Sequence, residues 1–141
     1  MKVRIKYFAD ITRLKKDPKG DMIDLRCAEE VHLKEGDYYA IPLGVAMELP
    51  TDYEAHVYPR SSTFKNFGIM PVNSVGIIDN SYCGDADEWH FLVHATEDTV
   101  IPFDSRIAQF KICHNQPDFI FEEVNFLGNN NRGGIGSTGI S

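Results

Sequence analysis

The sequence predicts an all-β protein, a sandwich or jelly roll with one short helix. Short segments of apolar or alternating side chains recur along the chain, and turn-forming residues separate them every few positions. Helical periodicity is almost absent, since only residues 61–67 are typical of a helix. At 141 residues the chain is long enough for one domain with a sizeable core.

Each expected element follows from its local pattern. Residues 3–8 alternate apolar and basic side chains, which is the period of a half-buried strand. Residues 11–19 are polar, mixed in charge and interrupted by Pro18, so we expect a loop. Ser61 is expected to cap the helix by accepting from exposed backbone N–H groups. The other expected strands are residues 22–27, 31–33, 38–41, 45–49, 54–58, 89–94, 100–101, 106–113 and 119–124.

Residues 73–84 are expected to form a β-hairpin with chemistry near its tip. Residues 75–78 contain strand formers, and residues 79–81 turn readily because short polar side chains bond neighbouring backbone groups. Asp79 and Tyr82 place a carboxylate and an aromatic ring close together. This pairing predicts a small pocket with a base and a stacking surface, although an ordinary hairpin with an Asp in its turn has the same pattern.

Charge and cysteine content argue against several classes of protein. The formal net charge of −7 argues against non-specific nucleic-acid binding, which requires a basic surface. No segment has the apolar length of a signal peptide or a membrane span. The three cysteines are odd in number, and neither they nor the five histidines show metal-binding spacing. We therefore expect reduced thiols in the cytoplasm.

Two segments before the C-terminal tail carry candidate phosphate ligands. Arg60, Ser61 and Ser62 lie at the expected helix start, where exposed N–H groups, a guanidinium and hydroxyls favour an anion. In residues 106–110 the Gln109 amide can donate to a phosphate oxygen. Taken alone, the first segment is more typical of a capped helix with a surface Arg, and the second of a rim Arg and a surface Gln.

The composition changes at Gly128, after which Gly, Asn and Ser dominate. We expect residues 1–127 to form the β domain and residues 128–141 to form a flexible arm, which cannot bury enough apolar surface to order itself. Residues 132–139 resemble a phosphate cradle of glycine N–H groups and hydroxyls, but not a P-loop, whose lysine is absent. A disordered tail and a tail that orders on a ligand look the same in sequence.

Four segments, taken together and in order, resemble motifs of the trimeric dUTPase family. Residues 75–84 resemble its third motif, Gly-x-Ile-Asp-x-x-Tyr-x-Gly, and residues 59–62, 106–110 and 132–139 are similar to the second, fourth and fifth. The first motif, usually Ala-Gly-x-Asp-Leu, is reduced to its final Asp-Leu in residues 21–25. Each motif alone is weak, but their joint occurrence in this order is very specific.

The resemblance implies a fold, an assembly and a reaction. Members of the family have a jelly-roll-like β-sandwich fold and form homotrimers with active sites at subunit interfaces. Motifs one, two and four come from one subunit, the hairpin from a second and the tail from a third. The implied reaction is Mg²⁺-assisted hydrolysis of dUTP to dUMP and pyrophosphate, which keeps uracil out of DNA and supplies dUMP for thymidylate synthesis.

The same resemblance implies roles for residues of this chain. Asp79 would hold and deprotonate the attacking water, since an aspartate is ordinarily ionised at neutral pH. Asp24 would contact the Mg²⁺ through water. The implied substrate contacts are Arg60, Ser61, Ser62, Asn73, Gly76, Ile77, Ile78, Tyr82, Gln109, Arg132, Gly134, Ile135, Gly136, Ser137 and Thr138.

One departure from the family concerns the ring that covers the base. The family usually has an aromatic residue in its tail at the position of Ile135, which can cover a base but cannot stack on it. A compensating ring is expected from residues 89–91. Strand alternation places Trp89 and Phe91 on one side and His90 on the other. We favour His90 as the pocket-facing ring, and core packing is the simpler interpretation of the other two.

Two other functions stay open at this point. The related dCTP deaminases share the fold and the Arg-Ser-Ser motif, but the chain shows no equivalent of their catalytic Glu arrangement or Gln-rich tail. A binding module is the second alternative, because dUTPases of some phages also bind host or regulatory proteins and use the nucleotide as a switch. The short linkers between the motifs leave no inserted interaction arm. The sequence does not distinguish a cellular from a phage or prophage origin.

Overall fold

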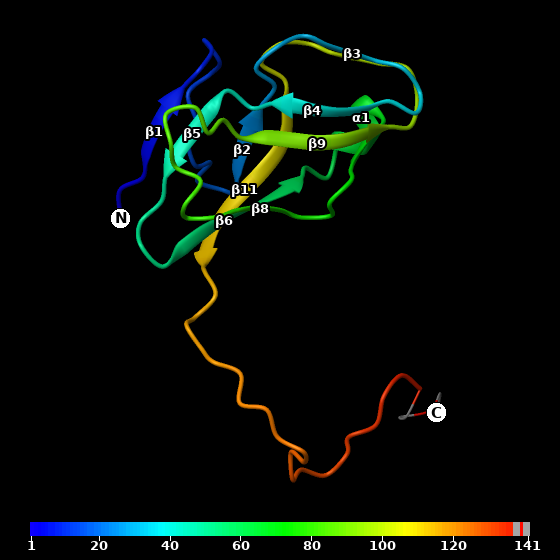
Figure 1. Cartoon of the computed structure of the whole chain (residues 1–141). Helices are drawn as coiled ribbons and strands as arrows, with labels where there is room; N and C mark the ends of the chain where they lie inside the picture. Colours follow the sequence, from blue (N-terminus) through cyan, green and yellow to red (C-terminus); the bar gives the residue numbers. More distant parts are fainter. Residues whose placement is uncertain (137–138, 140–141) are drawn as a thin grey trace.

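The computed structural model describes residues 1–136 and 139, and strands dominate it (Figure 1). The helix α1 (Thr63–Phe67) has five residues, and no described helix is long and apolar enough to cross a membrane. The predicted all-β fold with one short helix is confirmed. The strands are β1 (Arg4–Tyr7), β2 (Ile23–Arg26), β3 (Val31–Leu33), β4 (Tyr38–Pro42), β5 (Val45–Glu48), β6 (Tyr53–Pro59), β7 (Ile69–Pro71), β8 (Gly76–Ile78), β9 (His90–Ala95), β10 (Thr99–Ile101) and β11 (Arg106–His114).

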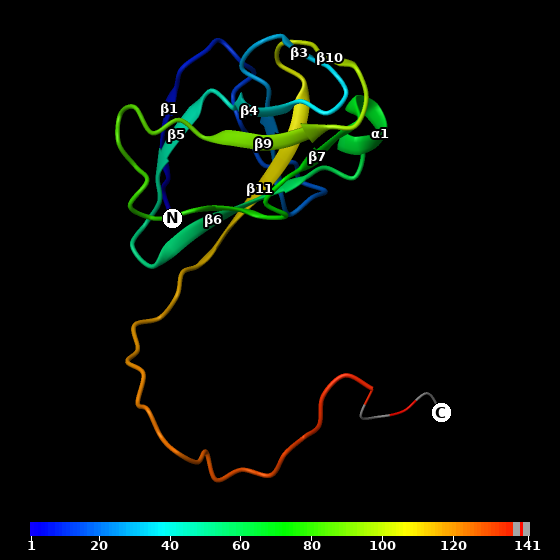
Figure 2. The same ribbon diagram turned by 45° about the vertical axis from the view of Figure 1, so that its right-hand side comes forward.

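The described strands pair into four antiparallel sheets. The order is β2-β11-β6-β8 in the largest sheet and β4-β9-β7 in the next, with β1-β5 and β3-β10 as separate pairs. Figures 1 and 2 show β4 and β9 on one side of the body and β6 and β8 on the other. The two larger sheets therefore enclose the core between them.

Strand alternation explains which side chains form this core. On β6, Ala55 and Val57 are buried, whereas the residue between them is only partly buried. Trp89, directly before β9, packs edge to face against Phe110 of β11, with ring centroids 5.2 Å apart. Contacts between large aromatic rings of this kind add about 0.5–1.5 kcal/mol beyond area burial. The Trp89–Phe110 pair thus joins the two larger sheets.

The helix begins differently from the sequence expectation. Its N-cap is Ser62 rather than Ser61, and the Ser62 side chain makes no capping hydrogen bond. The buried hydroxyl of Thr63 instead accepts from Arg60 N at 2.8 Å and donates to Ile107 O at 2.9 Å. Because a buried hydroxyl needs partners, this arrangement ties the start of α1 to β11.

The structure contains one strand that the sequence pattern does not indicate. Gly68 ends the helix in a left-handed conformation with φ 62°. The chain then passes directly into β7, which pairs with β9. Three residues ending in a proline give too short a pattern to identify a strand.

The predicted hairpin over residues 73–84 is wrong in its second arm. β8 pairs with β6, and the described chain forms no further strand before β9. Asn80 accounts for the different course, because its Nδ2 donates to the backbone oxygens of Leu49, Pro50 and Tyr53 at 3.3, 2.8 and 3.0 Å. These bonds hold the turn after β8 against the β5–β6 connection, so the chain does not fold back on β8.

The predicted strand over residues 119–124 is also wrong. After β11 the chain leaves the body and extends away from it, and every residue from 116 to 136 is exposed (Figures 1 and 2). A strand requires a neighbour, and this segment has none within the described chain. Its aromatic alternation produces only a local contact, in which Phe119 and Phe121 meet edge to face at 5.0 Å.

Candidate active site

A cavity of about 410 Å³ lies beside β8, and we name it the β8 cavity. It gathers seven of the predicted site residues, namely Asn73, Gly76, Ile77, Ile78, Asp79, Tyr82 and His90. The rest of the lining comes from Ala40, Glu88, Trp89 and Leu92. Its volume is within the range of small-molecule sites, and it combines apolar walls with a few polar groups.

The position of β8 makes its backbone available to a ligand. β8 is an edge strand, with β6 on one side only, so one row of its N–H and C=O groups faces away from the sheet. Glycine at position 76 avoids a close contact, because a Cβ there would lie only 3.3 Å from the Cβ of Val57 on the paired strand β6. The edge can therefore offer donors and acceptors to a flat polar ligand.

Two rings border the β8 cavity. The hydroxyl of Tyr82 donates to Glu88 O at 2.9 Å. Burial raises the pKa of Tyr82 above its ordinary value of 10.0, and the carboxylates of Asp87 and Glu88 raise it further, so the hydroxyl is a neutral donor at pH 7. His90 is exposed whereas Trp89 before it is buried, in the alternation that the sequence predicts.

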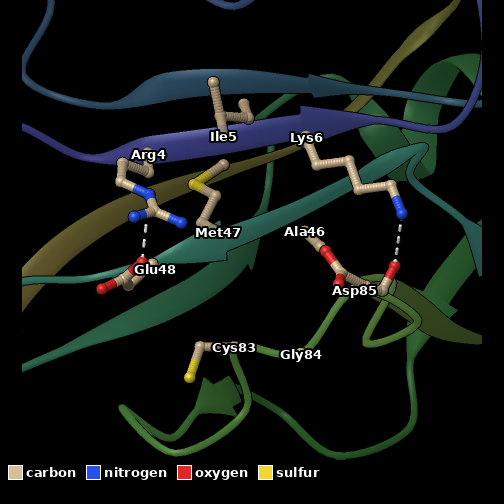
Figure 3. Close-up of a pocket in the computed structure, with 9 residues that line it drawn as sticks. All are labelled: Arg4, Ile5, Lys6, Ala46, Met47, Glu48, Cys83, Gly84 and Asp85. Atoms are coloured by element: carbon tan, nitrogen blue, oxygen red, sulfur yellow. Dashed lines mark hydrogen bonds and ion pairs between the residues drawn. The ribbon is translucent and has the colours of Figure 1, made fainter.

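The segment 79–89, which carries Asp79 and Tyr82, is held against β1 and β5. Lys6 Nζ of β1 donates to Asp85 O at 2.8 Å. The Glu88 carboxylate accepts from the backbone N–H of Gly44, directly before β5, at 2.9 Å. Figure 3 shows the turn at Asp85 beside these strands, around a smaller cavity of about 120 Å³. These contacts set the position of the segment relative to the core.

A second cluster, which we name the arginine site, consists of Asp24, Arg60 and Arg106. The Asp24 carboxylate lies 3.1 Å from Arg60 Nε and 3.5 Å from Arg106 Nη1. Strand register brings them together, because β11 pairs with β2 on one side and β6 on the other. The N–H groups that do not bond Asp24 leave a concentration of positive charge in a chain whose net charge is −7.

Three further predicted residues lie around the arginine site. Gln109 pairs with Asp24 across the β2–β11 ladder, and its Nε2 donates to Pro59 O at 3.1 Å. Ser61 is exposed and Ser62 is half-buried at the start of α1, directly after Arg60. The structure therefore brings Asp24, the second motif and Gln109 into one region.

The β8 cavity and the arginine site are separate within one copy of the chain. β8 runs antiparallel to β6, with Gly76 opposite Val57 and Ile78 opposite Ala55. The segment after β8 therefore starts near the N-terminal end of β6, whereas Arg60 follows its C-terminal end. A strand rises about 3.3 Å per residue, so several residues of β6 lie between the two clusters.

The predicted residues of the arm that the structure describes lie near neither cluster. Arg132, Gly134, Ile135 and Gly136 are exposed on the extended segment after β11 (Figure 2). Ser137 and Thr138 lie outside the described residues. In this single copy the described part of the arm, residues 128–136 and 139, therefore adds no residue to the lining of the β8 cavity or to the arginine site.

Two site residues were missed by reasoning from the sequence. Arg106 belongs to a segment that the motifs single out, but its ion pair with Asp24 depends on strand register, which no local pattern shows. Glu88 bonds Tyr82 through its backbone oxygen, and sequence carries no signal for such a bond. The Arg106–Asp24 contact joins distant parts of the chain, and the Tyr82–Glu88 bond depends on how the segment 79–89 folds on itself.

The fold and the two clusters define an all-β protein with a cavity of small-molecule size and a separate cationic site, and comparison with known proteins identifies the family. The dUTPase family model matches residues 10–139 of the chain. The chain belongs to the dUTPase family, and the enzyme class predicted from the sequence is confirmed.

Individual relatives agree with this assignment. The SPbeta prophage-derived deoxyuridine 5'-triphosphate nucleotidohydrolase YosS of Bacillus subtilis (strain 168) is 53% identical over 140 residues, which cover 99% of each chain. A mutant dUTPase of Staphylococcus bacteriophage 80alpha with dUpNHpp has a TM-score of 0.81 at 18% identity, covering 99% of both chains. A mutant dUTPase from phage phi11 of S. aureus, with a structural Mg(II) ion, has a TM-score of 0.73 at 14% identity, covering 90% of this chain and 99% of that one. The two structural likenesses show the shared fold.

Proposed function

We propose that the chain hydrolyses dUTP to dUMP and pyrophosphate, and thereby keeps uracil out of DNA and supplies dUMP for thymidylate synthesis. One observation carries this proposal: Asp79 and Tyr82 border the same cavity as the free edge of β8. The name of the B. subtilis relative supports the same substrate. The free thiols of the described cysteines are compatible with action in the cytoplasm.

In the proposed reaction Asp79 is the general base. Its carboxylate takes a proton from a water molecule while the water oxygen attacks the α-phosphorus. The bond from the α-phosphorus to the bridging oxygen breaks, and pyrophosphate leaves. Arg60, the two serines after it and Gln109 would orient phosphate oxygens, which lowers the barrier by removing a bimolecular entropy cost.

Selection of the nucleotide follows from the β8 cavity. The ring of Tyr82 would pack on the sugar and leave no room for a ribose 2′-hydroxyl. Backbone groups of residues 76–78, with Asn73, would match the uracil edge. Cytosine exchanges donor for acceptor at that edge and would leave buried polar groups unpaired, which discriminates by about 10⁴-fold or more. The methyl group of thymine would meet the backbone of β8.

The residues present fit Mg²⁺ in an outer position. Mg²⁺ usually keeps several waters and is held by one or two carboxylates and by substrate phosphates. Among the residues that the structure describes, no group of three or more His, Cys, Asp or Glu side chains converges into a metal cage. The Asp24 side chain, 34% exposed, would hold a water of the ion. When bound, the ion would offset the charge of the triphosphate.

A homotrimer with shared active sites is part of the proposal. The β8 cavity and the arginine site lie at opposite ends of β6, and residues 116–136 are exposed. Both facts support a site in which the β8 cavity of one copy faces the arginine site of a second. The arm, proposed as residues 128–141 beyond a β domain of residues 1–127, would close over the site from a third copy with Arg132, Gly134 to Gly136, Ser137 and Thr138.

The test is pyrophosphate release with Mg²⁺ from dUTP, dCTP, dTTP and UTP at equal concentration. Turnover restricted to dUTP would establish both the reaction and the selectivity of the β8 cavity. Ammonia release from dCTP would instead indicate a deaminase. If none of the four nucleotides is turned over although dUTP binds, the hydrolase proposal fails and a nucleotide-binding module takes its place.

A further inference from the structure

A third cavity, of about 400 Å³, adjoins the arginine site and has a strongly basic lining. We name it the basic cavity. Its wall contains five cationic side chains, Arg13, Lys15, Lys16, Arg26 and Arg106, and two carboxylates, Asp17 and Asp24. Asp24 and Arg106 also belong to the arginine site, so the two sites are continuous. The rest of the lining comes from Thr12, Leu14 and Pro18.

The loop that forms this wall is fixed rather than loosely attached. The Asp104 carboxylate accepts from Thr12 N at 2.9 Å and from Thr12 Oγ1 at 2.7 Å. It also lies 3.5 Å from Arg26 Nη1, which donates to Asp104 O at 2.9 Å. Asp104 has a positive φ of 69°, a conformation that aspartate tolerates better than most residues. One carboxylate thus joins the loop to β2.

The cations of the basic cavity differ in how far they are already engaged. Arg13 lies over the ring of Tyr7 at 4.2 Å and donates to a backbone oxygen of its own loop at 3.0 Å. Lys16 Nζ donates to Gly20 O at 2.8 Å. For the exposed Lys15, the described part of the chain provides neither a hydrogen bond nor an ion pair to its ammonium. Lys15 is therefore the cation of this wall that is available to a ligand.

We propose that Lys15, together with Arg106, binds the terminal phosphates of the nucleoside triphosphate and the pyrophosphate released from it. This inference rests on the proposed function, which places the base and sugar in the β8 cavity and the phosphates at the arginine site. The basic cavity continues from the arginine site, so the far end of a triphosphate chain reaches it. A compact ammonium on a flexible stem suits a phosphate group whose charge changes on release.

The experiment measures binding of inorganic pyrophosphate to the full chain by calorimetry, with Mg²⁺ present, for the wild type and Lys15→Gln. The expected result is about tenfold weaker binding for Lys15→Gln, the loss of one charge-assisted hydrogen bond. Lys19→Gln is the matched control, because Lys19 is exposed on the same segment but lies outside the lining of the basic cavity. The control should bind pyrophosphate as the wild type does.

Steady-state kinetics test whether Lys15 binds the terminal phosphates of the nucleotide as well as free pyrophosphate. Lys15→Gln should raise KM for dUTP about tenfold, change kcat little, and leave inhibition by dUMP unchanged, because dUMP lacks the terminal phosphates. Equal pyrophosphate affinity in Lys15→Gln and the wild type overturns the inference even if dUTP is hydrolysed. Conversely, Lys15-dependent pyrophosphate binding without dUTP turnover supports the inference and removes the proposed function.

Discussion

Tyr82 and His90 are oriented by the same acceptor. The Tyr82 hydroxyl donates to Glu88 O at 2.9 Å, and Nδ1 of His90 lies 2.9 Å from that same oxygen. A carbonyl oxygen has two lone pairs, so it accepts both bonds at once when Nδ1 carries the proton. The two rings therefore border the β8 cavity as a coupled pair, and Nε2 of His90 takes no part in this contact.

His90 is expected to cover the base in place of the missing tail aromatic. His90→Ala should raise KM for dUTP roughly tenfold with a smaller effect on kcat, since base–aromatic stacking contributes about 1–3 kcal/mol per base. His94→Ala is the control, because His94 is exposed on the same strand but does not line the cavity. Equal KM values for His90→Ala and the control in a pyrophosphate-release assay would exclude this role.

Asp79→Asn should lower kcat by about 100-fold or more and leave KM close to the wild-type value, because the amide cannot accept the proton of the attacking water. Asp85→Asn changes an exposed carboxylate of the same segment that lies outside the β8 cavity, and it should keep normal turnover. The assay is pyrophosphate release from dUTP at saturating substrate. Near-normal kcat in Asp79→Asn would show that the base is another group.

Tyr82 should act through its ring more than through its hydroxyl. Tyr82→Ala removes the surface against the sugar and should allow measurable turnover of UTP. Tyr82→Phe keeps the ring and loses only the bond to Glu88 O, so it should still reject UTP. The ratio of kcat/KM for dUTP and UTP is the measurement, and an unchanged ratio in Tyr82→Ala would refute this account of sugar selection.

The proposed sharing of each site among three copies predicts complementation between two inactive variants. Asp79→Asn and Arg132→Ala should each be nearly inactive when expressed alone. Co-expressed in equal amounts, they should recover about a quarter of wild-type activity, because random closed trimers contain sites that draw both intact residues from different copies. If Asp79 and Arg132 served a site from the same copy, mixing would restore no activity.

Asp104 should make stability depend on pH at the acid end. Burial alone would raise the pKa of Asp104, but hydrogen bonds from Thr12 and the charge of Arg26 hold that pKa below its ordinary value of 3.8. A carboxyl whose pKa is lower in the folded state stabilises the fold at pH values above its ordinary pKa. This stabilisation is lost as the pH falls through the folded-state pKa. Asp104→Asn should therefore lower the free energy of unfolding by about 1–2 kcal/mol at pH 7.

The control for this prediction is Asp10→Asn, which changes an exposed carboxylate elsewhere on the surface. Urea unfolding at several pH values should show the difference between Asp104→Asn and the wild type shrinking toward zero below pH 3.8. A constant difference across this range would mean that the carboxylate charge makes no contribution.

Local patterns in the sequence were enough for most of the strands. Alternation in β6 and β9 marks one buried and one outward face, and the structure buries Val57 and Phe91 as that pattern requires. Alternation also located β1, but the predicted buried face is wrong there, because Ile5 is exposed. Local patterns failed to predict the structure where the formation of a strand depended on pairing with another segment. Residues 119–124 are rich in strand-forming side chains but lack a neighbour, and the turn after β8 follows the side chain of Asn80 instead of closing a hairpin.

In the candidate site, too, local sequence patterns predicted some features, whereas contacts between distant strands decided others. The residues of the β8 cavity are close in sequence, so one motif contained Gly76, Asp79 and Tyr82 together. The ion pairs of Asp24 with Arg60 and Arg106 join strands far apart in the chain, and only their register brings them into contact. The roles of the individual residues stay predictions until the variants above are measured.

Trp89 is the one tryptophan of the chain, and its side chain is 0% exposed. Its Nε1 has no hydrogen-bond partner among the described residues, although the indole packs on Phe110 and contributes to the lining of the β8 cavity. An indole combines an apolar body with one polar N–H, so its fluorescence reports the polarity around it. Tryptophan emission from the native protein therefore originates from a residue that lines the β8 cavity. It gives the molecule an intrinsic optical probe of nucleotide binding without any added label.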